Sequence, residues 1–120
     1  MIAQTNERIE FLTDILITAV EGGVNHWAQV SYYSPDGPPE KRGAFLSVDD
    51  GDTHWLGLDQ IEKGVQRIVK DRSLPHLAKP VMIASICNDV CPDEPGAQDI
   101  DAGFADAIVQ YALFRELVYG

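Results

Sequence analysis

The chain has 120 residues, of which 45% are hydrophobic and 23% are charged, as in a folded globular protein and unlike a disordered tail. Nineteen Asp and Glu residues against nine Lys and Arg residues give a formal net charge of -10. Because duplex DNA and anionic membranes bind clustered cations, this charge argues against direct binding of either one. It favours a basic protein partner, or simply solubility.

The first predicted helix covers residues 6–20, where apolar side chains recur at three- and four-residue steps. Gly22 and Gly23 are expected to end it, because glycine readily adopts the left-handed conformation that follows many helices. A strand is predicted from there to Tyr33. Regular alternation along that strand places Tyr32 and Tyr33 on opposite faces, with Tyr32 beside the strand's alanine and valine.

Two further strands are predicted at residues 43–48 and 53–58, joined by an acidic turn. The simplest assembly is an antiparallel meander with helices on one face. Asp59 and Glu62 fit a capping box, in which Asp59 is the N-cap of the next helix and Glu62 bonds back to it. That helix ends before residue 75.

Two more helices complete the prediction. A short one runs from Val81 to about Asn88, after a proline at its first turn. The last begins after Asp101, a suitable N-cap, and its apolar stripe continues through Leu117 toward the C-terminus. We therefore predict a single α+β domain over residues 1–120, a three-stranded antiparallel meander with about four helices in the order α-β-β-β-α-α-α.

One candidate site lies at the corner between the first helix, the first strand and the last helix. Asp106 and Gln110 are one turn apart on the last helix and share a face. Together with Asp101, Glu21 and Trp27 they could line a polar pocket. The alternative is that these side chains cap helix ends and satisfy backbone groups at the corner.

A second candidate is a basic ridge formed by Lys63, Arg67 and Lys70, which follow each other at helical spacing. Such a ridge could bind the phosphate of a nucleotide-like signal, with Trp27 or Trp55 stacking on its base. This small-ligand function is our alternative hypothesis. Basic residues at this spacing are more often a solvated face balanced by nearby acids.

The sequence predicts neither a metal site nor a cofactor. Cys87 and Cys91 are four residues apart, but His76 is the only nearby imidazole and no second ligand pair exists, so reduced, buried thiols are expected. The chain has no nucleophile motif and no phosphate-binding glycine loop, which predicts a protein that is not an enzyme. Without a signal peptide or a membrane span, a cytoplasmic location in a host cell is expected.

Two motifs of the chain resemble those of a known family. Residues 21–27 read EGGxxxW, and residues 100–120 read IDAxxADxIVQxxxFxExVYG. The segment 58–68 is also similar, whereas the loops at 34–42 and 71–99 are not. The resemblance is to small uncharacterised proteins encoded by phages, plasmids and integrated mobile elements. It implies a mobile-element origin and carries over no catalytic role.

These observations together predict an acidic, mobile-element-encoded protein that inhibits a host defence macromolecule by protein–protein contact, with carboxylates that imitate nucleic acid. A homodimer through the apolar C-terminal end is a further option. The acidic residues expected to bind the host protein are Asp49, Asp50, Asp52, Asp93, Glu94 and Asp99.

Overall fold

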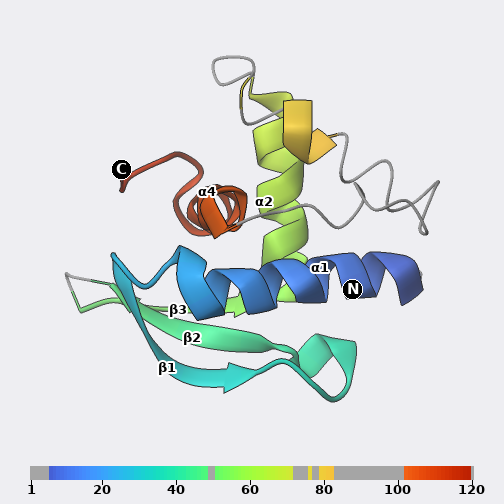
Figure 1. The fold of residues 1–120 in the computed structure, drawn as a ribbon. Coiled ribbons are helices and arrows are strands. Elements are labelled where there is room, and N and C mark those ends of the chain that lie inside the picture. The colour runs from blue at the N-terminus through green and yellow to red at the C-terminus, as the bar shows by residue number, and fades with distance from the viewer. Residues whose placement is uncertain (1–5, 49–50, 72–75, 77–78, 83–101, 120) are drawn as a thin grey trace.

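Helices pack against one side of a three-stranded antiparallel sheet, in the α+β arrangement that the sequence predicts (Figure 1). The computed structural model describes residues 6–48, 51–71, 76, 79–82 and 102–119. The elements are α1 (Asn6–Thr18), the π-helical turn η1 (Ala19–Gly23), β1 (Ala28–Ser34), the 3₁₀ turn η2 (Pro39–Lys41), β2 (Gly43–Val48), β3 (Thr53–Gly57), α2 (Leu58–Lys70) and α4 (Ala102–Phe114).

The sheet has the order β1-β2-β3, and its register corrects the predicted faces of β1. Val30 pairs with Leu46 and Tyr32 with Phe45, so that Ser31 is an extra residue in the ladder. This bulge reverses the alternation after residue 30, because one inserted residue moves every later side chain to the opposite face. Tyr32 therefore points away from the helices.

The glycines after α1 do not act as predicted. Gly22 and Gly23 are absent from the positive-φ residues, and the helix continues through them as the wider turn η1. Gly23 is required for a different reason: a Cβ at this position would lie 2.9 Å from the carbonyl oxygen of Ala102. The glycine thus lets η1 approach the first turn of α4 closely.

Helix α2 begins one residue before the predicted N-cap. Its N-cap is Gly57, whose amide N–H donates to the Gln60 side chain at 3.0 Å. The back-bonding residue is therefore Gln60 and not Glu62, which instead binds Arg8 of α1. Gly64 lies where α2 crosses α4, and a Cβ there would overlap the carbonyl oxygen of Ile108.

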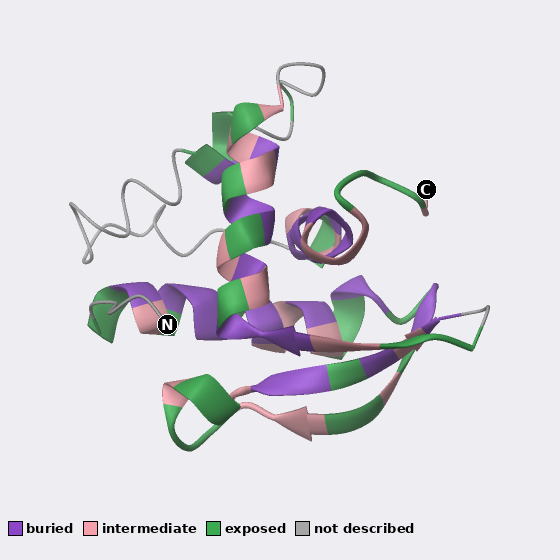
Figure 2. Ribbon diagram, turned by 180° about the vertical axis from the view of Figure 1, so that it is seen from behind, coloured by how far each residue is buried: buried purple, intermediate pink, exposed green. Residues whose placement is uncertain are grey.

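Helix α4 is a central packing element, as its sequence predicts, and its middle, from Ala105 to Tyr111, is largely buried. Figure 2 shows the buried parts of the chain in purple. Its end was predicted wrongly, because the helix stops at Phe114 and Arg115 adopts a positive φ of 65°. Residues 115–119 form a non-helical tail. No helix in the described part of the chain is long and apolar enough to cross a membrane.

Two predicted features of the helices lie wholly or partly outside the described residues. Asp101, the expected cap of α4, is one. The predicted helix from Val81 is the other: residues 79–82 are helical and Val81 is fully buried, whereas the remainder lies beyond the described segment.

Candidate functional site

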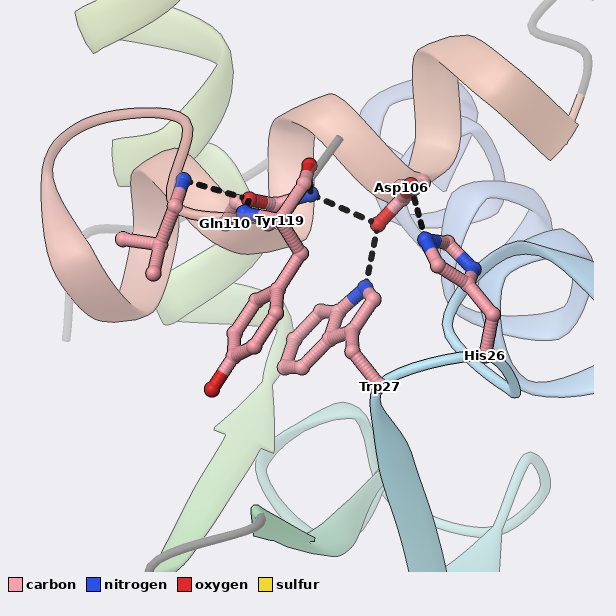
Figure 3. Close-up of polar contacts among 6 residues, drawn as sticks. His26, Trp27, Asp106, Gln110 and Tyr119 are labelled. Carbon is pink, nitrogen blue, oxygen red and sulfur yellow. Dashed lines mark hydrogen bonds and ion pairs between the residues drawn. The ribbon is translucent and has the colours of Figure 1, made fainter.

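The corner between β1 and α4 is built around one buried tryptophan. Trp27 is 3% exposed and immediately precedes β1, and its indole N–H donates to Asp106 Oδ1 at 2.6 Å. Asp106 is on the second turn of α4, which η1 positions through the close approach at Gly23. A short hydrogen bond to a carboxylate is strong, so it fixes β1 to α4 at this point (Figure 3).

Gln110 lies one turn further along α4 and is 1% exposed. Its amide nitrogen donates to Asp106 Oδ1 and to the carbonyl oxygen of Tyr119, each at 3.1 Å. Its amide oxygen accepts the backbone N–H groups of Val118, at 2.7 Å, and Tyr119, at 2.8 Å. The side chain thus uses its full hydrogen-bonding capacity, and three of these four bonds hold the C-terminal tail.

The tail places an aromatic ring over Trp27. Tyr119 stacks on the indole with ring centroids 5.0 Å apart and an interplanar angle of 5°. Phe114 meets the same indole edge-on at 5.6 Å, and also contacts His54 of β3. The space that the sequence predicts as a polar pocket is therefore filled by the tail.

The second carboxylate oxygen of Asp106 faces His26. His26 Nε2 lies 3.5 Å from Asp106 Oδ2, and the exposed fractions of the two side chains are 50% and 15%. A histidine held by a carboxylate is the base portion of a hydrolytic triad. Among the described residues, however, no hydroxyl or thiol is hydrogen-bonded to His26, so this pair is not assembled with a nucleophile.

An open hollow of about 330 Å³ lies beside the corner. Its lining contains polar groups from the start of β1 and the end of β2 but no Lys or Arg. A phosphate in it would therefore meet neither a guanidinium nor an ammonium group of the lining residues. The lining residues are Asn25, His26, Trp27, Ala28, Gln29, Ser47 and Val48.

The residues predicted to bind a small ligand come together only in part. Trp27, Asp106 and Gln110 meet at the corner, whereas Glu21 is exposed on η1 and stays outside their hydrogen-bond network. Its charge acts on Tyr33, whose pKa is raised by burial and then by the nearby carboxylate of Glu21.

The predicted basic ridge is also divided between two roles. Lys63 and Lys70 are exposed on α2. Arg67 donates to the carbonyl oxygens of Tyr111 and Ala112, both at 2.9 Å, and so caps the C-terminal end of α4. A cation at this end also suits the helix dipole. The guanidinium is therefore engaged in packing α2 on α4.

Most of the predicted protein-binding acids lie outside the described residues, namely Asp49, Asp50, Asp93, Glu94 and Asp99. Asp52 is described and exposed after the turn at Gly51, whose φ is 89°. No group of three or more His, Cys, Asp or Glu residues that could hold a metal occurs in the described part of the chain. Cys87 and Cys91 lie beyond it.

The structure reveals an acidic surface on α1 that the sequence analysis missed. Glu7, Glu10 and Asp14 are all exposed and, at three- and four-residue spacing, lie on one side of the helix. We call these three residues the α1 ridge. Partial burial and then the charge of Glu10 raise the pKa of Asp14. The helical spacing of the acids was the available signal.

A second missed feature is an aromatic row on the outer face of the sheet. Tyr32, Phe45 and Trp55 come from the three strands and lie opposite one another in the register. Only the bulge at Ser31 brings Tyr32 into this row, so alternation alone could not identify it.

Comparison with known protein families, curated proteins and solved structures found no match.

Proposed function

We propose that the chain is a protein-binding module that holds a positively charged surface of a partner protein, and that its function is binding and not catalysis. The α1 ridge is the observation that carries this proposal. After Arg8 the sequence contains no Lys or Arg before Lys41, so Glu10 and Asp14 have no cationic neighbour along the helix after Arg8. Exposed acids attract basic surfaces over roughly one Debye length, about 10 Å at 0.1 M salt.

The arrangement of the arginines supports the same proposal. Arg8 is buried and binds both carboxylate oxygens of Glu62, at 2.8 and 2.6 Å. Arg42 donates to the carbonyl oxygen of Gly37 and to the Thr13 hydroxyl, and Arg67 caps α4. These three arginines are thus held by contacts within the fold, and the charge of Arg8 is balanced by Glu62.

The identity of the partner class rests on the sequence resemblance. A mobile-element origin favours a host macromolecule, and an acidic ridge of this kind would compete with nucleic acid for the partner's basic groove. We therefore propose inhibition of a host nucleic-acid-binding defence protein in the cytoplasm.

The test is capture of partners from bacterial lysate on the immobilised chain, at about 50 mM and about 500 mM salt. The ridge variant Glu7→Gln/Glu10→Gln/Asp14→Asn is compared with the wild type and with a control that removes two exposed charges from α2, Lys63→Gln/Lys70→Gln. We expect a basic partner that wild type and control retain at low salt and that the ridge variant loses. Equal retention by the ridge variant would refute the proposed surface.

The small-ligand alternative has weaker support. Arg67 is engaged in capping α4, and the hollow beside His26 contains no Lys or Arg. A thermal-shift screen with nucleotides and cyclic dinucleotides separates the two functions, because a ligand of the folded state raises its melting temperature. We expect no shift.

A further inference from the structure

None of the described helices α1, α2 and α4 covers the outer face of the sheet, since all three lie on its other side (Figure 1). At its centre are the aromatic row residues Tyr32, 52% exposed, and Phe45, 40% exposed, with Trp55 beside them. Phe45 and Trp55 have ring centroids 5.0 Å apart, and Tyr32 lies 6.1 Å from Phe45. The outward positions of the three strands carry no charged residue.

Two glycines hold the Trp55 ring across this face. A Cβ at Gly43 would lie 2.6 Å from Trp55 Cζ2, and one at Gly57 would lie 2.7 Å from Trp55 Nε1. The ring therefore lies over both glycines, in space that any side chain would fill. Its indole N–H has no hydrogen-bond partner among the described residues, and the side chain is partly exposed.

Next to Trp55 is a hollow of about 100 Å³. Its charged lining residues are Glu40 and Asp59, and neither carboxylate has a hydrogen bond or ion pair with a described residue. The N-terminal end of α2 contributes roughly half a positive charge, so two carboxylates leave the hollow negative. The complete lining is Pro39, Glu40, Trp55, Gly57, Leu58, Asp59 and Gln60.

We propose that the aromatic row and this hollow bind an arginine side chain presented by a basic segment of a partner protein. The inference rests on the proposed function and adds a second contact surface to the α1 ridge. A planar guanidinium stacks on the indole of Trp55 and donates to the carboxylates of Glu40 and Asp59. The flanking rings of Tyr32 and Phe45 cover the apolar part of the segment.

The charge of the surface distinguishes this occupant from the others. An exposed aromatic row on a sheet can also stack nucleobases, but such sites pair the rings with cations that follow the phosphates. Here the adjoining hollow carries carboxylates, which repel phosphate. A second copy of the chain, with its charge of -10, would bring further negative charge to the same surface.

The test is an NMR titration of the ¹⁵N-labelled chain with an acetylated, amidated tetra-arginine peptide, and with tetra-lysine and tetra-glutamate peptides of the same form. Tetra-arginine should shift the indole N–H of Trp55 and the Gln60 amide. Tetra-lysine should act about tenfold more weakly, because it forms no planar, bidentate contact. Tetra-glutamate should have no effect.

The decisive variants keep the fold and change the surface. Glu40→Gln/Asp59→Asn should weaken the peptide-induced shift of the Trp55 indole N–H at least tenfold. Glu21→Gln/Glu116→Gln removes the same charge at exposed positions outside both proposed surfaces and should leave that shift intact. Trp55→Ala should abolish the Gln60 shift, with the rest of the spectrum confirming the fold.

Each contrary result has a separate meaning. Shifts confined to the α1 ridge would overturn this inference and leave the proposed function standing. No shift anywhere would overturn both. Equal effects of lysine and arginine would refute guanidinium recognition. A Trp55 shift that depends on protein concentration would mean that a second copy of the chain, and not arginine, occupies the surface. A Trp55 shift caused by oligo-uridine would mean that the occupant is RNA.

Discussion

Replacing Gln110 with leucine should release the C-terminal tail from the corner. Leucine has a similar volume but forms none of the four hydrogen bonds of the amide. With the tail still docked, the backbone groups of Val118 and Tyr119 would be left without their partner, at about 1–3 kcal/mol each. Detachment is less costly, because water then satisfies these groups.

The loss of stability is set by the side-chain surface that becomes exposed when the tail detaches. Tyr119 is half-buried, and its stacking on Trp27 is worth about 0.5–1.5 kcal/mol beyond burial. Adding part of the roughly 1.5–3 kcal/mol for burying a large apolar side chain gives a loss of about 2–3 kcal/mol. For a chain of this length, that lowers the melting temperature by about 8–15 °C.

The assay is thermal unfolding, followed by the fluorescence of Trp27 in a Trp55→Phe background. Gln66→Leu, at an exposed position of α2, is the matched control and should change stability by less than about 0.5 kcal/mol. A second background ends the chain at Phe114, so that no tail is present. There Gln110→Leu should cost less than about 1 kcal/mol, since only the bond to Asp106 is lost. An equal cost in both backgrounds would refute the reasoning.

Three further predictions concern the packing of α2 on α4 and follow from the same structure. Gly64→Ala should destabilise the protein by about 1–3 kcal/mol in a denaturant titration, because overlap with a backbone carbonyl outweighs the roughly 1 kcal/mol gain in helix propensity. Gly22→Ala is the control and should be neutral or stabilising, because its Cβ would lie 3.9 Å from its nearest neighbour. Burial and the hydrogen-bonded carboxylate of Asp71 raise the pKa of Tyr111 to about 12. The contribution of this group to the free energy of unfolding is therefore complete below pH 10 and is lost as pH rises toward 12. Tyr111→Phe should flatten that part of the profile of stability against pH. Arg67→Ala should lower stability by about 1.5–3 kcal/mol, whereas Lys63→Ala should not change the melting temperature.

Those parts of the fold that depend on local pattern were predictable. Strand β2 has the predicted bounds, 43–48, because its apolar residues alternate and turn residues follow it. Asp106 and Gln110 were expected to share a face from their spacing alone, and the hydrogen bond between them confirms it. Trp27 joins them from 79 positions away, a contact that no local pattern specifies.

The errors have tertiary causes. No glycine or proline near Ser31 indicates a bulge in the sequence. The one extra residue nevertheless moves Tyr32 to the outer face of the sheet. The end of α4 is set by Arg67 capping its carbonyls and by Gln110 binding the tail, which together stabilise a non-glycine residue, Arg115, at positive φ. The apolar stripe of the sequence continues past this point and therefore predicts too long a helix.

The closed corner also bears on where the protein binds. A ligand that enters beside Trp27 must first displace Tyr119, at the cost of about 2–3 kcal/mol worked out above, which weakens binding roughly 30- to 150-fold. The outer face of the sheet has no such penalty, since Trp55 is already presented there. The tail and Trp55 lie on opposite sides of the sheet, so Gln110→Leu should leave the effect of tetra-arginine on Trp55 unchanged. If tail release alters that titration, the two faces are coupled and the corner takes part in binding.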